Sequence, residues 1–122
     1  MPKKIINFDT VREIAIELPG VEESTAYGAP ALKIHGKLLA CIPSHRSAEP
    51  DSLVVRVDFD DRAELLESDP AVYYLTDHYV GYSAVLVRLS RVNAEALRDL
   101  LRMAHKFVNR KAAHSAPKRR PG

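Results

Sequence analysis

The chain has 122 residues, 46% of them hydrophobic and 28% charged, which is the composition of one folded domain. Its single cysteine excludes an internal disulfide and any zinc or iron–sulfur site built from several cysteines. The longest apolar run, Leu38 to Ile42, is too short to cross a bilayer. Because the first residues also lack the apolar stretch of a signal peptide, we expect a cytoplasmic protein with no membrane partner.

The net charge of +2 conceals an uneven distribution of charge. All 16 acidic residues precede residue 100, whereas the rest of the chain carries only cations: Arg102, Lys106, Arg110, Lys111, Lys118, Arg119 and Arg120. A basic end on an acidic body favours nucleic acid or another anionic surface, and a solubilising tail is the alternative. We expect one domain over residues 1–111 and a basic, disordered tail over 112–122, where no periodicity remains.

The first helix is predicted from a capping box at Thr10-x-x-Glu13, and Pro19-Gly20 is expected to end it. Residues 21–30 are expected to form a connecting loop. A hairpin follows over Leu32–Cys41, with its turn at His35-Gly36 or at Gly36-Lys37. Both registers place Lys33 and His35 on the outer face and four apolar residues on the core face: Leu32, Ile34, Leu39 and Cys41.

The second half of the chain predicts three strands and two helices. The first is a strand with Leu53, Val55 and Val57 facing the core, and a helix follows from Asp61 to before Pro70. Two more strands are expected over Val72–Val80 and Ala84–Leu89, joined by a turn at Gly81-Tyr82-Ser83. Asn93 is expected to cap the final helix. The apolar stripe of that last helix consists of Leu97, Leu100, Leu101, Ala104, Phe107 and Val108. The element order α-β-β-β-α-β-β-α predicts an α+β fold, a two-layer sandwich with an antiparallel sheet covered by helices on one face.

Catalytic and cofactor motifs are absent from the sequence. There is no Gly-x-Ser-x-Gly and no glycine-rich phosphate loop, and Cys41 is expected on the core side of its hairpin, where a thiol is inert. No two of the candidate metal ligands are expected four positions apart on one helix, since Pro43 and a loop separate Cys41 from His45; the candidates are His35, His45, His78, Asp77 and Cys41. We therefore expect no enzymatic activity, no metal and no cofactor.

Three cations are predicted to share the open face of the sheet, because Lys33, Arg56 and Arg88 each lie mid-strand opposite the apolar stripe. His35 and one of the tyrosines Tyr73, Tyr74 or Tyr79 are expected beside them. A cationic face with tyrosines suits phosphates and bases. The alternative is a solvated face on which these cations pair with Asp58 and neighbouring acids.

Several short motifs occur in an order that resembles the MmcQ/YjbR-like family. They are Leu18-Pro19-Gly20-Val21-Glu22-Glu23-Ser24, Tyr27-Gly28-x-Pro30-x-x-Lys33-x-x-Gly36-Lys37, Leu53-Val54-Val55-Arg56, the helix from Arg62 to Pro70, His78-Tyr79-x-Gly81 and Val85-Leu86-Val87-Arg88-Leu89. The resemblance covers residues 9–108 and leaves the basic tail outside.

The resemblance implies a small two-layer fold similar to secretion-chaperone-like domains, in a bacterial-type protein of poorly defined function. Family members are described as DNA-binding proteins of a double-wing type, and the Leu32–Ala40 hairpin is the candidate wing. Carried over by position, together with His35 at the hairpin tip, the candidate binding residues are Tyr27, Lys33, His35, Lys37, Arg56, His78, Tyr79 and Arg88. Two functions stay open: a DNA-binding accessory protein, and a protein- or small-ligand-interaction module that uses the same face or the Tyr27–Pro30 loop. We expect a monomer or a weak homodimer.

Overall fold

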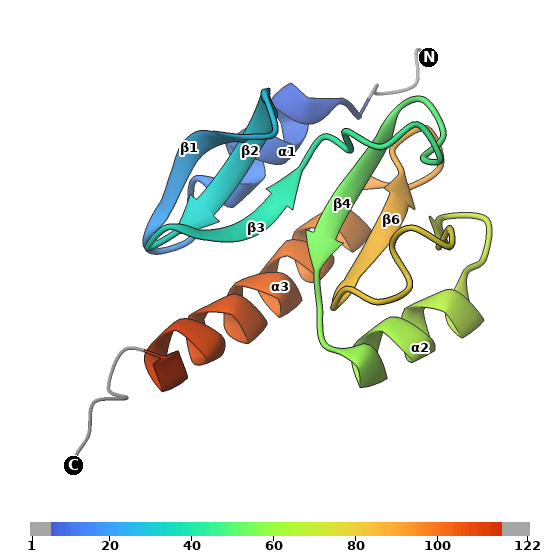
Figure 1. Ribbon diagram of the computed structural model, residues 1–122. Helices are drawn as coiled ribbons and strands as arrows, with labels where there is room; N and C mark the ends of the chain where they lie inside the picture. Colours follow the sequence, from blue (N-terminus) through green and yellow to red (C-terminus); the bar gives the residue numbers. More distant parts are fainter. Residues whose placement is uncertain (1–5, 116–122) are drawn as a thin grey trace.

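A computed structural model describes the backbone of residues 6–115 and the side chains of residues 6–110. The fold is α+β, with three helices and one six-stranded antiparallel sheet, and the predicted fold class is confirmed. The elements are α1 (Phe8–Ala15), β1 (Val21–Ala26), β2 (Ala29–Ile34), β3 (Lys37–Cys41), β4 (Ser52–Arg56), α2 (Phe59–Ser68), β5 (Tyr73–Tyr74), β6 (Ala84–Arg88) and α3 (Ala94–Ser115). The strand order across the sheet is β1-β2-β3-β4-β6-β5, and α3 crosses one face with α1 beside it (Figure 1).

The sheet has one strand more than expected, because the segment after α1 is not a loop. Val21–Ala26 forms β1, the edge strand, and pairs antiparallel with β2. Only Val21 is buried, and the next four residues are exposed. An exposed edge strand needs no apolar alternation, so the polar run Glu22–Thr25 hid it from the sequence pattern.

Two consecutive two-residue hairpin turns join the first three strands. Tyr27 and Gly28 have φ of 53° and 80°, and His35 and Gly36 have φ of 50° and 80°. Positive φ at both central residues is the type I′ pattern, which matches the twist of the paired strands. Since Ile34 pairs with Lys37, the second turn is His35-Gly36, the first of the two registers that the sequence left open.

A bulge in the second hairpin reverses the expected orientation of Cys41. Leu32 pairs with Ala40 but Lys33 pairs with Leu38, so Leu39 is an extra residue in β3. Leu39 and Ala40 both join the main core, and Cys41 turns to the opposite face beside Ala31. The expectation that Cys41 faces the main core is therefore wrong, although the thiol is buried.

The helix ends also differ in part from the predictions. Asn7, not Thr10, caps α1: the Asn7 side chain accepts a hydrogen bond from the Thr10 amide, and the Thr10 hydroxyl accepts one from the Asn7 amide. The helix ends at Ala15, well before Pro19-Gly20. Asp58 caps α2, so this helix begins at Phe59 rather than Asp61.

The last helix begins where the sequence predicts. Its C-terminal end and the length of the fourth predicted strand differ from the prediction. The Asn93 side chain accepts a hydrogen bond from the Ala96 amide. The helix continues to Ser115, beyond the boundary expected at residue 111, and residues 116–122 lie outside the described part. The strand predicted over Val72–Val80 is reduced to Tyr73–Tyr74. Residues 75–83 form a loop of turns, because Asp77 and Gly81 favour turns over strand.

The sheet separates two clusters of buried side chains. On one face Leu53, Val55 and Val57 lie in the main core, which α1, α2 and α3 cover, and the predicted parity of this strand is confirmed. All six residues of the α3 stripe are buried there as well. On the other face lies a smaller cluster of Ala31, Cys41, Val54, Tyr79, Ala84 and Leu86. No helix of the described chain packs on this smaller cluster, and the loops 42–51 and 75–83 border it.

Candidate binding site on the open face of the sheet

A cavity of about 540 Å³ lies over the smaller cluster, and we call it the aromatic hollow. Its floor comes from β3 and β4, and its walls come from the loops that follow β1, β3 and β5. The lining residues are Tyr27, Leu38, Cys41, Pro43, Ser44, His45, Val54, Arg56, His78, Tyr79, Tyr82 and Ser83. The hollow therefore unites four of the sequence-predicted site residues: Tyr27, Arg56, His78 and Tyr79.

The floor of the hollow is apolar. Leu38, Val54 and Cys41 supply it, and only 6% of Cys41 is exposed. Burial raises the pKa of the Cys41 thiol to about 11, so the thiol is protonated at neutral pH. Because the thiolate is the reactive form, Cys41 acts here as a small hydrophobic side chain and not as a nucleophile.

Two histidines from different loops form a stacked pair in the wall. The rings of His45 and His78 lie parallel within 8°, with their centroids 3.7 Å apart. The Tyr79 ring meets both edge-on, at 4.7 Å from His78 and 6.3 Å from His45. Edge-to-face and stacked contacts of this kind fix ring orientations, so the wall presents an ordered aromatic surface.

Hydrogen bonds between the loops hold this wall in place. His45 Nδ1 accepts from the Ser47 amide at 3.1 Å, which puts the proton of the neutral ring on Nε2. The Ser47 hydroxyl lies 2.8 Å from that of Thr76, which joins loop 42–51 to loop 75–83. Partial burial, and then the charges of His78 and Arg46, lower the pKa of His45, so the His45 ring is uncharged at neutral pH.

Arg56 is the one Lys or Arg among the residues that line the hollow. Its Nε donates to the Ser83 carbonyl and its Nη2 to the Ser83 hydroxyl, both at 2.9 Å. The guanidinium also lies 5.4 Å from the centre of the Phe107 ring on α3. Burial lowers the pKa of Arg56, but the group starts so high that it keeps its charge at neutral pH. Its orientation is thus fixed without a carboxylate partner among the described residues.

Tyr27 stands at the rim of the hollow in an unfavourable backbone conformation. The residue is 90% exposed and its φ is 53°. Glycine, asparagine and aspartate are the usual residues at this turn position, and a bulky residue there is strained. Strain of this kind concentrates at functional sites.

The other predicted site residues lie outside the hollow. Lys33, His35 and Lys37 belong to the β2–β3 hairpin. Arg88 is held by Glu49 through two hydrogen bonds of 2.8 Å, donates to the carbonyls of Pro70 and Ala71, and stacks on the Tyr74 ring at 4.2 Å. Pairing with an acid, the alternative interpretation of the cationic face, therefore holds for Arg88, with Glu49 rather than Asp58 as the acid. The three cations do not form one cluster.

Eight of the twelve lining residues are not among the binding residues predicted from the sequence, and three of these eight carry an aromatic ring or a thiol: Cys41, His45 and Tyr82. The sequence pattern predicts the wrong face for Cys41, a turn position for Tyr82, and no role for His45 other than that of a candidate metal ligand. His45 and His78 are 33 positions apart in irregular loops, and no period in the sequence connects them. The one usable signal was the density of aromatic and histidine residues in segment 78–82.

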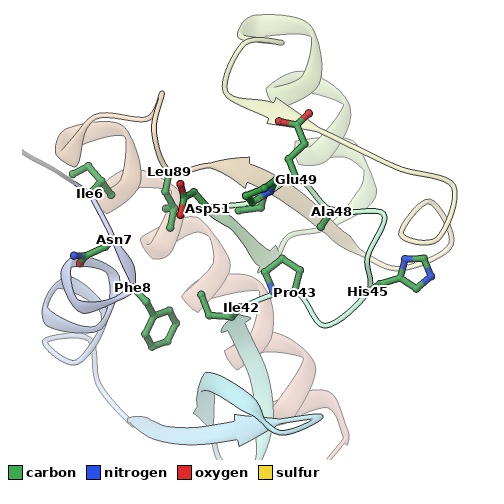
Figure 2. A pocket seen from close by; sticks show the side chains of 12 residues that line it. Ile6, Asn7, Phe8, Ile42, Pro43, His45, Ala48, Glu49, Asp51 and Leu89 are labelled. Carbon is green, nitrogen blue, oxygen red and sulfur yellow. The ribbon is translucent and has the colours of Figure 1, made fainter.

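A second, smaller cavity of about 360 Å³ lies between the start of α1 and the loop before β4 (Figure 2). Its apolar side chains include Ile6, Phe8, Ile42 and Leu89. In Figure 2 the His45 ring points away from these side chains, toward the other side of its loop. Glu49 is already paired with Arg88. No group of three metal-ligating side chains occurs among the described residues.

The outer surface of α3 carries a row of four cations. Three of them are among the C-terminal cations noted in the sequence, but their common spacing on one helix was not predicted. Arg98, Arg102, Lys106 and Arg110 recur at every fourth position and are exposed, and we call them the α3 basic row. Their ion pairs are long: Arg102 lies 3.8 Å from Asp99, and Arg110 lies 3.7 Å from Asp58. The sequence feature that could have predicted this row is its i, i+4 spacing, because side chains four residues apart lie on the same side of a helix.

Known proteins resemble this chain in sequence and in fold. Uncharacterized proteins of Mycobacterium bovis and Mycobacterium tuberculosis are 36% identical over 58 residues, a match that spans 45% of this chain and 45% of each relative. The crystal structure of Deinococcus radiodurans protein DR2400, which contains a DUF419 domain, superposes with a TM-score of 0.71 at 24% identity, covering 92% of this chain and 85% of that one. That similarity concerns the fold.

In the part of the chain that the structure describes, every helix is too short or too polar to span a bilayer. The YjbR family model matches residues 16–107, which include every residue that lines the aromatic hollow. The chain therefore belongs to the YjbR family.

Proposed function

We propose that this protein is a non-enzymatic accessory protein that binds nucleic acid through the phosphate backbone, with the α3 basic row as its main contact surface. The observation that carries the proposal is the alignment of Arg98, Arg102, Lys106 and Arg110 along one exposed helix surface. Four residues of α-helix rise about 6 Å, so the row presents regularly spaced charges over roughly 18 Å. Such a row suits a repeating polyanion better than a single acidic group.

The charges of the row are available for phosphates. The side chain of Arg102 is 63% exposed and that of Arg110 is 58% exposed, and each lies near the limit of ion-pair distance from its acid. Exposed pairs of this kind contribute little, about 0 to 1 kcal/mol, so a phosphate can replace the carboxylate at small cost. By contrast, the Arg88 pair with Glu49 is bidentate and would have to be broken.

The predicted wing makes a smaller contribution in this proposal. Lys33 and Lys37 on the β2–β3 hairpin have no ion-pair partner among the described residues. The hairpin thus offers two cations, whereas the α3 basic row offers four. Arg56 contributes less because its guanidinium is already hydrogen-bonded to Ser83. The non-enzymatic part of the proposal is supported by the protonated, buried state of Cys41.

The test measures binding of a labelled 20-base-pair DNA duplex over a series of salt concentrations. Arg102→Gln with Lys106→Gln removes two charges from α3, and Lys33→Gln with Lys37→Gln removes two from the hairpin as a matched control. Each lost phosphate contact should make the slope of log affinity against log salt shallower by about 0.9. We expect the α3 variant to lose close to two such contacts and the hairpin variant less than one.

A third protein, truncated after Ser115, separates the helix from the basic residues Lys118, Arg119 and Arg120. The proposal holds if this truncation keeps most of the affinity and the α3 variant loses it. It fails if truncation alone abolishes binding, if the hairpin variant has the larger effect, or if the full chain does not bind the duplex even at low salt, where non-specific contacts are strongest.

A further inference from the structure

The aromatic hollow has the size and composition of a small-molecule site. Its volume of about 540 Å³ lies within the range of roughly 300–1,000 Å³ that ligand pockets occupy. Hydrophobic and aromatic side chains predominate, and a few polar groups, from serine, histidine and arginine, converge on them. It lies on the face of the sheet opposite the main core that α3 covers.

The walls favour a flat ring. The stacked pair of His45 and His78 and the edge-on Tyr79 are ordered by their mutual contacts. Tyr82 is 57% exposed although its ring lies only 5.9 Å from that of His78. An aromatic ring exposed to water in this way can stack on another flat ring. The imidazole nitrogens and the hydroxyl groups can donate and accept hydrogen bonds, so they favour a heteroaromatic ring over a hydrocarbon.

The charge of the lining favours an anion. None of the twelve lining residues is acidic, while Arg56 and two histidines are present. Arg56 is half-buried, its Nε and Nη2 are engaged by Ser83, and its Nη1 has no hydrogen-bond partner among the described residues. Partial burial of a guanidinium without a carboxylate partner carries a desolvation cost, and a bound anion that accepts hydrogen bonds from the guanidinium offsets this cost.

We propose that the aromatic hollow binds a mononucleotide, with its base against the exposed rings and its phosphate beside Arg56. The ligand combines the two properties that the lining selects, a flat heteroaromatic ring and an adjacent negative group. Tyr27, held at the rim in a strained turn, closes over the ring edge in this arrangement. The site is separate from the α3 basic row, because the two sets of residues have no member in common.

The test titrates the full chain with adenosine 5′-monophosphate and with adenosine by calorimetry. Tyr82→Ala removes an exposed stacking ring and should weaken binding of both ligands about 5- to 150-fold, the range for one base stacked on an aromatic side chain. Phe59→Ala is the matched control, because Phe59 is 51% exposed on α2 and lies outside the hollow. This control should change the affinity less than twofold.

Arg56→Gln tests the phosphate contact. We expect it to reduce the affinity for the monophosphate to that for adenosine and to leave adenosine binding within twofold. Because Arg56 contacts Ser83 and Phe107, its fold is checked by circular dichroism. If that variant unfolds, the preference of the wild type for the monophosphate over adenosine, together with the Tyr82→Ala result, decides the question.

Cys41 reports whether the ligand sits in the hollow. It is the only cysteine and lies in the floor, so saturating monophosphate should slow its alkylation in the wild type at least threefold, measured at alkaline pH because burial keeps the thiol protonated at neutral pH. The proposal is overturned if millimolar monophosphate does not bind, if Tyr82→Ala and Phe59→Ala behave alike, or if Cys41 is not protected.

Two further outcomes also overturn the proposal and separate it from the proposed function. Monophosphate binding that is lost in Arg102→Gln with Lys106→Gln, and not in Arg56→Gln, would place the phosphate on α3. Single-stranded DNA that requires Tyr82, with no binding of the free monophosphate, would make the occupant an unpaired base of a strand. Duplex binding in the salt series is read independently, so either proposal can fail while the other holds.

Discussion

The two faces of the sheet bury side chains by different means. On the covered face, aliphatic residues pack under α1 and α3, and most of them are wholly buried. On the open face, the buried cluster is small, includes a tyrosine and a cysteine, and is bordered by two loops instead of a helix. The covered face therefore holds most of the buried apolar side chains of the domain, and the open face holds the aromatic hollow.

Strand β4 shows this difference within two neighbouring residues. Val55 points to the covered face and is fully buried, and Val54 points to the open face and is 5% exposed. Val54 lines the aromatic hollow, whereas Val55 belongs to the main core. The exposed fractions of the two valines are almost equal. They differ in their surroundings, because close-packed side chains surround Val55 and an open cavity lies beside Val54.

The largest expected effect comes from Val55→Ala compared with Val54→Ala. Val55→Ala leaves a closed cavity between the sheet and α3 and should lower the free energy of unfolding by about 2–3 kcal/mol, between the usual costs of Ile→Val and Leu→Ala. Val54→Ala enlarges a hollow that is already open and should lower it by about 1 kcal/mol. Urea unfolding of the two variants measures both values, and equal losses would contradict the distinction between the faces.

The covered face was largely predictable from sequence, because its signal is periodic. The alternation of Leu53, Val55 and Val57 and the stripe of α3 each fix a face without knowledge of the turns. Local exceptions were not predictable in this way. The bulge at Leu39 shifts the parity of β3, and only the pairing with β2 reveals it.

The aromatic hollow was predictable only in part. Arg56 follows from strand parity, and Tyr27, His78 and Tyr79 came from motif positions. The pairing of His45 with His78 depends on how two irregular loops fold over the sheet, through contacts such as that between Ser47 and Thr76. Loops of this kind carry no period, so their side chains can be placed only in three dimensions.

An intermediate effect is expected at the two hairpin turns, where Tyr27→Asn and His35→Asn form a matched pair. Both residues have φ near 50°, and asparagine tolerates this conformation better than tyrosine or histidine. Each variant should raise the free energy of unfolding by roughly 0.5–1 kcal/mol, measured by urea unfolding. Only Tyr27→Asn should weaken monophosphate binding, because only Tyr27 lines the aromatic hollow. A loss of stability in Tyr27→Asn would show that the ring packs on the open face instead of standing strained above it.

The smallest expected effect concerns Glu49 and Arg88, the pair that removes a cation from the open face. A hydrogen bond from Arg88, opposed in part by burial and supported by the charges of Arg88 and Arg91, lowers the pKa of Glu49 from its ordinary value of 4.5. A carboxyl whose pKa is lowered on folding stabilises the folded state above its unfolded pKa and loses that contribution as the pH falls through the folded value.

Glu49→Gln should therefore be slightly less stable than the wild type at pH 7, and the difference should shrink below about pH 4.5 as Glu49 is protonated. Thermal unfolding between pH 7 and pH 3 measures it. Glu67→Gln is the control, since Glu67 is an exposed acid on α2 that makes no ion pair within the described residues. A difference that stays constant down to pH 3 would mean that the Glu49 side chain stabilises loop 42–51 by packing, for example beside Tyr74, and not by its charge. Arg88 would then be free to contribute to the open face, and the contrast between its paired state and the unpaired Arg56 would disappear.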